Sequence, residues 1–428
     1  MPATFRSFAE RNYRLFFAGA LISNVGTWMS RVAQDWLVLV ELTDHDATAL
    51  GLVTGLQFLP MLLLAPFAGV VADRFPKIRV LTATNLAMCL TSVLLAALVM
   101  TGVAQLWHVY ALALAQGLAA AVDGPTRQAF VSEIVSPDNL SNAVGLNSAS
   151  FNAARIVGPG VAGLMIAGVG TGPVFAVNAV SFLGYLGVIA LMDRALLHPA
   201  PAARGRGRLV EGLRYVRSRP DIVLLLVIVF MYGTFAMNFQ MTTALMATMV
   251  YGKGPAEYGL LGSIMAVGSL SAAIWVASRA RPRLRVVLGA LAAYTLLSTA
   301  LALAPTYEAF AALLIPVGFT ALTVLPTCNA LVQLSAAPQM RGRVLALYMA
   351  IFFGGTPLGA PMIGWIGEHW GPRWTILVGS IATGVTFLAA SAYVLRAGDL
   401  HVRYQRRRPF VYLERGGPVI NPIPDDTR

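Results

Sequence analysis

Two opposite charges stand inside an apolar run near the start of the chain. The stretch GTWMSRVAQDWL, residues 26–37, contains Arg31 and Asp35, while LFFAGALIS precedes it and VLV follows it. Residues four positions apart lie on one face of a helix, so these side chains can neutralise each other. A carboxylate in such a place can also bind and release a proton, which makes ion-coupled chemistry a candidate.

Two interpretations of these charges stay open. In the first, Asp35 is the protonatable group: ionised, it pairs with Arg31 or with Arg155, the third charge well inside an apolar run, and protonated, it releases the arginine. In the second, Arg31 and Asp35 form a static pair that permits membrane insertion and fixes packing. Charges within membrane segments are costly and functional by default. Arg155 has no acidic residue in its own segment, so an anionic group of a substrate is a candidate partner for it.

The composition around these charges is that of a polytopic membrane protein. Of 428 residues, 57% are hydrophobic and 12% are charged, whereas soluble domains contain about 25% charged residues. The formal net charge of +12 does not indicate nucleic-acid binding, because the basic residues lie in short loops between apolar segments. Cys89 and Cys328 lie in apolar segments without a His/Cys cluster, so neither a metal site nor another cofactor is expected.

The sequence carries no signature of an enzyme. Its five histidines are scattered in loops or at the ends of apolar segments. HExxH, GxSxG and Walker motifs are absent, so neither hydrolysis nor ATP-driven transport is indicated.

Twelve apolar segments are long enough to cross a bilayer. A hydrocarbon core of about 30 Å needs about 20 helical residues, and the alternation of a closed barrel is absent. The pattern predicts an all-α membrane protein with two pseudo-symmetric six-helix bundles. The predicted spans are 14–40, 49–72, 79–101, 106–124, 139–168, 172–192, 221–250, 256–278, 285–304, 307–333, 342–367 and 373–396.

Four parts of the chain follow from these spans. Residues 1–192 form the N-terminal six-helix half, and residues 221–396 form the C-terminal half. The loop 193–220 combines the linker PAPAARGRGR with LVEGLRYVRS, which is typical of a basic amphipathic helix on a membrane surface. Residues 397–428, which include RYQRRRPF, are expected to form a disordered cytoplasmic tail near anionic headgroups.

The distribution of Lys and Arg predicts the orientation. Nearly all 31 of them fall in the N-terminus, the central loop, the tail and the loops after spans two, four, eight and ten. Outside the spans, Lys253 and Arg373 alone fall on the other side. Positive charge marks cytoplasmic loops, so both termini and the central loop are expected in the cytoplasm. The first span is too long for the apolar core of a signal peptide and should remain in the membrane.

The loop after span two carries a family motif. It reads GVVADRFPKIRVL, and Gly69, Asp73, Arg74 and Lys77 resemble the loop signature Gly-x-x-x-Asp-Arg-x-Gly-Arg-Arg of the major facilitator superfamily. Pro76 replaces the usual glycine and keeps a turn. A generic basic loop would explain the cations but not the glycine and the aspartate, and the motif also stands at the expected place between spans.

The resemblance implies a gate on the cytoplasmic side. In that superfamily the loop aspartate braces the N-terminal end of span eleven, where an anion is favourable. Asp73 is therefore expected near Arg341 and Arg343, and Arg74 is expected to reach Asp123 at the end of span four. These contacts would break when the cytoplasmic side opens.

The fifth span carries a second motif. It reads GLNSASFNAARIVGPGVAG, and Gly145, Gly158, Pro159 and Gly163 resemble the antiporter motif of the superfamily, with alanines at two glycine positions. The motif implies export by proton exchange. The alternative is an ordinary seam of small residues, which lets membrane helices pack closely. The wider sequence resembles a bacterial branch that includes the enterobactin exporter and drug/proton antiporters.

Span four departs from that branch at one position. The stretch ALAQGLAAA matches a family motif at Gln116 and Gly117, but Ala113 occupies the position of an arginine. The resemblance links that arginine to proton transfer. Coupling in this chain therefore needs other residues than in the better-known drug/proton antiporters.

Polar residues in several spans are candidates for substrate contacts. In span one they follow helical spacing together with Arg31 and Asp35, so this stripe should face water or the bundle interior rather than lipid. The resemblance places spans one, four, seven and ten around a central cavity. The candidates are Asn24, Thr27, Gln34, Gln116, Asn152, Asn238, Gln240, Thr323 and Thr327.

These features lead to one expected function. The chain is expected to be a monomeric secondary transporter of the cytoplasmic membrane that exports small amphipathic, drug-like or siderophore-like compounds by proton antiport with alternating access. Its expected partners are a small-molecule substrate, protons and membrane lipid. The alternatives are proton-coupled uptake by symport and a membrane scaffold or receptor that transports nothing.

Overall fold

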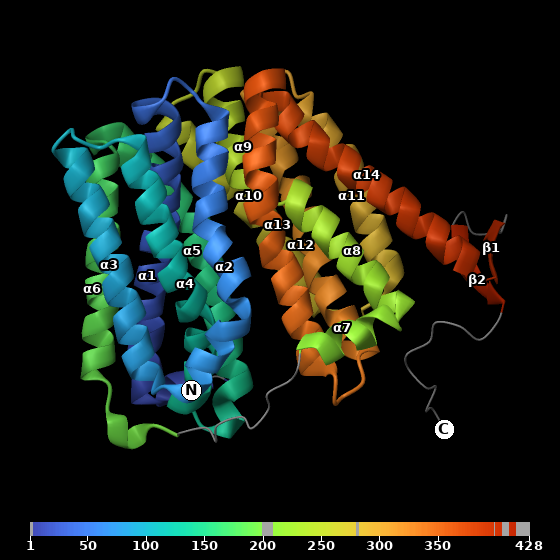
Figure 1. Ribbon diagram of the computed structural model, residues 1–428, viewed down its shortest axis with the longest axis horizontal. Helices are drawn as coiled ribbons and strands as arrows, with labels where there is room; N and C mark the ends of the chain where they lie inside the picture. The colour runs from blue at the N-terminus through green and yellow to red at the C-terminus, as the bar shows by residue number, and fades with distance from the viewer. Residues whose placement is uncertain (1–2, 199–208, 280–281, 398, 405–410, 417–428) are drawn as a thin grey trace.

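Two helical lobes stand side by side in the computed structural model (Figure 1), which describes residues 3–198, 209–279, 282–397, 399–404 and 411–416. The N lobe, residues 3–198, contains the helices α1 (Arg11–Trp36), α2 (Ala47–Arg74), α3 (Lys77–Met100), α4 (Leu106–Ile134), α5 (Leu140–Val169) and α6 (Thr171–Leu191). The C lobe, residues 209–397, contains α7 (Leu209–Arg217), α8 (Pro220–Phe235), α9 (Phe239–Leu245), α10 (Pro255–Ala277), α11 (Leu284–Ala302), α12 (Tyr307–Ser335), α13 (Arg341–Trp370) and α14 (Pro372–Ala397).

Shorter elements join or extend these helices. They are η1 (Ala3–Ala9), η2 (Leu37–Leu42), η3 (Pro137–Asn139), η4 (Arg194–Leu196), η5 (Met246–Val250) and the strands β1 (Asp399–Tyr404) and β2 (Val411–Gly416). Of these, η2 continues α1 and η5 continues α9 as wider π-helical turns.

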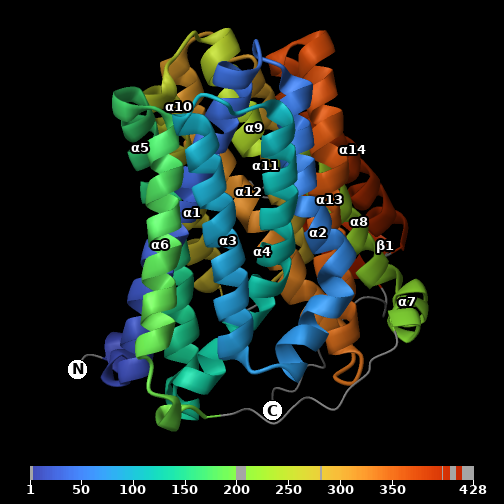
Figure 2. The same ribbon diagram turned by 60° about the vertical axis from the view of Figure 1, so that its left-hand side comes forward.

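Eleven helical segments of the described chain, with α8 to η5 taken as one, are long and apolar enough to cross a membrane. Helix α1 is long enough but less apolar, because polar residues occupy one of its faces. It nevertheless packs against α5 and α6 within the bundle, as Figure 2 shows. The predicted all-α membrane fold with two six-helix bundles is thus confirmed, with α1 as the twelfth member.

Two observed segments differ from the predicted spans. Helix α4 continues to Ile134, past the predicted end at 124, because a helix can project beyond the apolar layer without breaking. The segment 221–250 is broken between α8 and α9. At this break the Asn238 side chain donates a hydrogen bond of 2.8 Å to the Thr234 carbonyl oxygen, which satisfies an acceptor that the interrupted helix leaves free.

The two ends of the lobes differ in charge. We call one of them the basic end; it contains η1, α7 and the turns at 75–76, 135–139, 192–193 and 336–340. We call the other the opposite end; it contains the turns at 43–46, 101–105, 251–254 and 303–306. In Figure 1 the N-terminus and α7 mark the basic end, at the bottom, and the ribbons of the two lobes diverge toward it.

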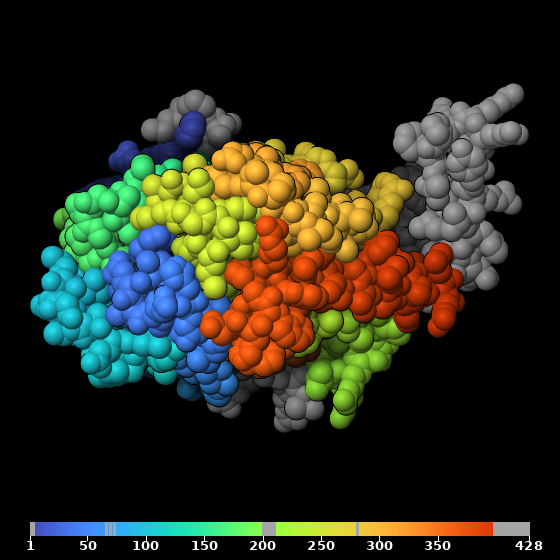
Figure 3. Space-filling model, turned by 90° about the horizontal axis from the view of Figure 1, so that it is seen from above, coloured from blue at the N-terminus to red at the C-terminus, as the bar shows by residue number. Residues whose placement is uncertain are grey.

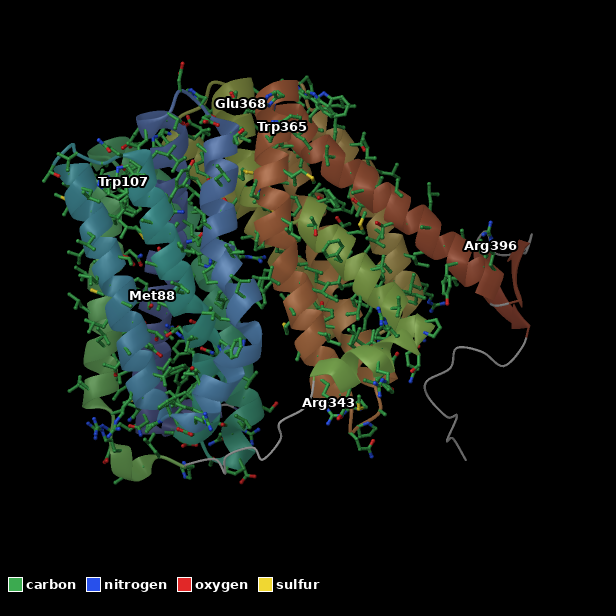
Figure 4. All side chains as sticks on the ribbon, in the orientation of Figure 1. Met88, Trp107, Arg343, Trp365, Glu368 and Arg396 are labelled. Atoms are coloured by element: carbon green, nitrogen blue, oxygen red, sulfur yellow. The ribbon has the colours of Figure 1, made fainter. Side chains whose placement is uncertain are left out.

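The central loop and the tail contain more local structure than a plain linker. Helix α7 bears out the predicted helix of the central loop, and its Glu211 pairs with Arg343 of α13 at 2.8 Å, near the label in Figure 4. The predicted linker at 199–208 lies outside the described residues.

A two-stranded antiparallel hairpin of β1 and β2 lies within the segment that is predicted to be disordered. The alternation of Leu400, Val402 and Tyr404 with polar residues is the period-two pattern of a strand, and it corrects the prediction for these residues. The remainder of the tail, 405–410 and 417–428, lies outside the described residues.

A buried polar cluster braces the N lobe near its basic end. The Asp123 carboxylate of α4 accepts hydrogen bonds of 2.8 Å from Thr84 and 2.8 Å from Asn85, both on α3, and pairs with Arg127 at 3.0 Å. The predicted contact between Asp123 and Arg74 is therefore corrected. Arg127 lies one turn along the same buried helix face, whereas Arg74 is exposed.

Replacing Asp123 with alanine should destabilise the N lobe, because it removes the ion-pair partner of the largely buried Arg127 and an acceptor that Thr84 and Asn85 share. Removing one partner of a buried ion pair costs about 3–5 kcal/mol. The thermal unfolding temperature of the purified Asp123→Ala variant should fall clearly, and that of the exposed control Asp138→Ala should not. Equal unfolding temperatures for the two variants would show that the cluster contributes little.

Candidate functional site

Asp35 lies at the contact between the two lobes. The residue is 5% exposed, and its Oδ2 accepts a hydrogen bond of 2.7 Å from the Tyr258 hydroxyl of α10. The same hydroxyl lies 3.5 Å from the Gln240 carbonyl oxygen of α9. The predicted protonatable group of the N lobe is therefore held by a residue of the C lobe.

The predicted pair of Arg31 and Asp35 is not among the ion pairs of the described residues. The Arg31 guanidinium lies instead over the rings of Trp28, at 5.0 Å, and Phe58, at 5.5 Å. Helical spacing puts both charges on one side of α1, but it does not determine which neighbouring residue each side chain contacts. The carboxylate finds a hydrogen-bond donor in the other lobe, and the cation finds aromatic faces in its own.

Two arginines inside the N lobe keep polar atoms without a partner among the described residues. Nε of Arg31 and Nη2 of Arg155 are buried and make no hydrogen bond to any of them. Phe151 precedes Arg155 by one turn of α5, and its ring packs against Trp28 of α1 with 6.0 Å between the ring centroids. The Arg31 guanidinium thus lies on one ring of this pair, and Arg155 follows the other ring by one turn of α5.

Small residues bring the lobes into backbone contact toward the opposite end. A Cβ atom at Gly163 of α5 would collide with the carbonyl oxygen of Pro255, and a Cβ atom at Gly364 of α13 would collide with that of Ala47. The Ala47 N–H also donates a hydrogen bond of 2.9 Å to Oε2 of Glu368. We call these two contacts, α5 with α10 and α2 with α13, the interlobe seam.

The interlobe seam closes the lobes on one side only. Seen from the opposite end, the elements of the two lobes abut (Figure 3), and Glu368 labels this end of α13 in Figure 4. Toward the basic end the described contacts between α2 and α13 continue as far as Leu62 and Gly354, beyond which the ribbons diverge. The structure is therefore closed at the opposite end.

The antiporter-like motif of α5 forms part of this seam. A Cβ atom at Gly158 would lie 2.6 Å from Cβ of Trp28, and Pro159 packs against Gly259 and Gly262 of α10. Gly145, nearer the basic end, has no such neighbour among the described residues within 4 Å. The motif thus acts in this structure as a packing seam, and its link to export stays a prediction.

The predicted gate residues at the basic end make contacts within their own lobes. Lys77 pairs with Glu133 at 2.5 Å, Arg343 pairs with Glu211, and Nε of Arg341 donates a hydrogen bond of 2.9 Å to the Gln333 carbonyl oxygen. The expected contact of Asp73 with Arg341 and Arg343 stays a prediction. The side chains of Gly69 and Asp73 lie outside the described part of the chain.

Most of the polar cavity candidates bond to their own helix. Thr27, Asn152, Asn238, Thr323 and Thr327 each donate to a backbone carbonyl one turn earlier. Gln34 is buried, and Asn24 and Gln116 are half-buried. Gln240 is the candidate whose carbonyl oxygen the structure brings to the Tyr258 hydroxyl. Substrate contacts of the whole set stay a prediction.

The sequence did not reveal which residues contact Asp35 and Arg31 or pack beside them. Tyr258 stands near the end of an apolar span, where a tyrosine is common as an interfacial anchor. Trp28, Phe58 and Phe151 look like ordinary apolar residues of their spans. Their roles depend on which helices meet, and no local pattern in the sequence marks that.

Comparisons with known proteins agree with this fold. A family model described as transmembrane secretion effector matches residues 2–414. The chain is 28% identical over 412 residues to the multidrug efflux pump Tap of Mycolicibacterium fortuitum, covering 92% of this chain and 96% of that protein. It is 28% identical over 193 residues to the staphyloferrin A transporter of Staphylococcus aureus, covering 45% of this chain and 48% of that protein.

Solved structures of transporters share the architecture. A point mutant of the nucleoside transporter NupG superposes with a TM-score of 0.73 at 14% identity, covering 89% of this chain and 99% of NupG. The inward-open xylose transporter XylE from E. coli gives a TM-score of 0.66 at 12% identity, covering 89% of this chain and 95% of XylE. At these identities the likeness concerns the fold alone.

Adding one methyl group at Gly163 should loosen the interlobe seam. Its Cβ atom would meet the Pro255 carbonyl oxygen, and overpacking of this kind costs about 1–3 kcal/mol. Hydrogen–deuterium exchange of backbone amides in residues 255–262 should be faster in Gly163→Ala than in the wild-type protein. The control Gly168→Ala adds the same methyl group to α5 where no described atom lies within 4 Å, and unchanged exchange in both variants would contradict the seam.

Proposed function

The chain belongs to the transmembrane secretion effector family of the major facilitator superfamily, and we propose that it exports small amphipathic compounds by proton antiport. Its fold and relatives are those of transporters, and relatives named for drug efflux and for a siderophore support a drug-like or siderophore-like substrate. In this proposal the protein acts as a monomer in the cytoplasmic membrane, with protons, substrate and lipid as its partners.

The proposal places the basic end in the cytoplasm, because positive charge marks cytoplasmic loops. On that assignment the structure corresponds to an inward-facing state, since the interlobe seam closes the opposite, outer end. Alternating access then requires the seam to open while the lobes close at the basic end, as the two halves rock about a midplane site.

The observation that carries the proposal is the position of Asp35 in the outer contact. When the seam opens, the separation of Asp35 from Tyr258 exposes the carboxylate to water. When it closes, the carboxylate becomes buried, and burying an ionised group costs far more than burying the neutral acid. Binding of a proton from outside therefore favours closure, and its loss to the inside favours reopening. In the proposed antiport cycle, the substrate leaves through the open outer end before the proton binds there.

Transport in liposomes of purified protein tests the proposal. Substrates are first identified by thermal stabilisation of the protein with a panel of antibiotics, dyes and siderophores. For an antiporter, an acidic lumen should drive uptake of the substrate into the liposomes. Uptake driven only by an acidic exterior would identify a symporter, and binding without any counterflow would identify a receptor.

The Asp35→Asn variant should lose proton-driven transport by tenfold or more while folding normally. Asparagine keeps the shape and the acceptor for the Tyr258 hydroxyl but cannot exchange a proton. Substrate counterflow without a proton gradient should persist, because it needs no net proton movement. The control Asp44→Asn removes an exposed carboxylate at the same end and should transport like the wild-type protein. Wild-type uptake by Asp35→Asn under a proton gradient would remove Asp35 from the coupling mechanism.

A further inference from the structure

We propose that the substrate is an anion with an aromatic or otherwise planar apolar body, and that Arg155 and Arg31 bind its negative group between α1 and α5. The inference rests on the proposed function, because it assigns a substrate class to the same transporter. Trp28 and Phe58 present their rings to the Arg31 guanidinium, and Phe151 precedes Arg155 by one turn of α5.

The site carries more positive than negative charge. An arginine stays protonated in proteins, so Arg31 and Arg155 contribute two positive charges. The nearby carboxylate of Asp35 is engaged by Tyr258 of the other lobe, and neither arginine is part of an ion pair among the described residues. A negative group that enters the site therefore meets cations whose charge is not already matched by a contact.

Free hydrogen-bond donors accompany this charge. Nε of Arg31 and Nη2 of Arg155 are buried and make no hydrogen bond to a described residue. A buried donor without an acceptor is unfavourable, and more so on a charged group. A carboxylate, sulfonate or phosphate oxygen supplies the acceptor, and arginine suits such groups because of its planar set of donors. A neutral acceptor would satisfy the donors without offsetting their positive charge, and a cationic substrate would be repelled by that charge.

The two arginines are positioned toward one place by helix packing. Gly158 of α5 lies against Trp28 of α1, and the Phe151 ring packs against the Trp28 ring with 6.0 Å between the ring centroids. Arg155 stands between these two contacts, four residues after Phe151 and three before Gly158, so it shares their helix face. The Arg31 guanidinium lies 5.0 Å above the same Trp28 ring.

The aromatic rings suit the apolar part of the substrate. Trp28 is half-buried and Phe151 is exposed, so both rings retain surface that a ligand can contact. A planar body can stack on these rings while its negative group reaches an arginine. The site thus selects for two features at once, negative charge and a flat apolar surface.

Two xanthene dyes of opposite charge test the inference. Fluorescein is an anion, and rhodamine 6G is a cation with the same ring system. Binding to purified protein in phosphatidylcholine nanodiscs is measured by fluorescence polarisation, with empty nanodiscs as the blank. Fluorescein should bind saturably and at least tenfold more tightly than rhodamine 6G. Equal or tighter binding of rhodamine 6G would overturn the inference.

Variants locate the binding group. Arg155→Gln should weaken fluorescein binding by about tenfold or more, as expected for loss of a charge-assisted hydrogen bond, and Arg155→Lys should retain most of the affinity. Arg31→Gln should also weaken binding. Arg279→Gln removes the same charge from an exposed position on the C lobe and should bind like the wild-type protein. Wild-type affinity in a folded Arg155→Gln variant would contradict the site.

The outcome separates this inference from the proposed function. If fluorescein binds with the expected dependence on Arg155 but does not move across proteoliposomes, the anion site stands and the transport proposal fails. If rhodamine 6G is transported under a proton gradient and fluorescein neither binds nor moves, transport stands and the anion site fails.

Discussion

A hydrogen bond between Asp35 and Tyr258 joins an ionisable group to the contact that holds the two lobes together. Its importance comes from its place rather than from its strength. A carboxylate in the middle of one lobe could change charge without consequence for the other. At the interlobe seam, the same change of charge alters the free energy of closure, because closure removes the Asp35 carboxylate from water. In the proposed mechanism, the fold thereby connects proton binding with the relative position of the two bundles.

The seam around this bond has to be tight for that connection to work. Gly163 and Gly364 allow the backbones of facing helices to touch at two places of the seam. Glu368 adds a further hydrogen bond across the lobes at the start of α2. The basic end is built differently. Among the described residues of that end, Lys77 pairs with Glu133 and Arg343 with Glu211 of its own lobe.

The membrane explains why much of the fold could be predicted from the sequence. Each helix must cross a layer of fixed thickness, so the lengths of apolar runs give both the number of helices and most of their ends. Helix α4 exceeded its predicted length because its last turns are polar and project beyond that layer. The break at Asn238 was not foreseen, since the segment around it is as apolar as an intact span. The polar stripe of α1 was recognised, and it lies inside the bundle.

The pairing of charges could not be predicted in the same way. Sequence spacing suggested that Arg31 would neutralise Asp35, whereas the carboxylate contacts Tyr258, more than two hundred residues away. The gate contacts of Arg74, Arg341 and Arg343 were inferred from a family resemblance. A contact between lobes depends on the state of the transporter, and the motif carries no information about which state is observed. Aromatic neighbours such as Trp28 became meaningful only when helices α1 and α5 were seen to meet.

The coupling between Asp35 and the seam can be measured directly by double electron–electron resonance. Spin labels at the exposed positions Asp44 and Glu308, in a background with Cys89→Ser and Cys328→Ser, report the separation of the lobes at the opposite end. In nanodiscs, the short-distance population of the otherwise wild-type protein should grow as the pH falls from mildly alkaline to mildly acidic. The Asp35→Asn protein should show the short distance at every pH, and a full pH response in that variant would contradict the account.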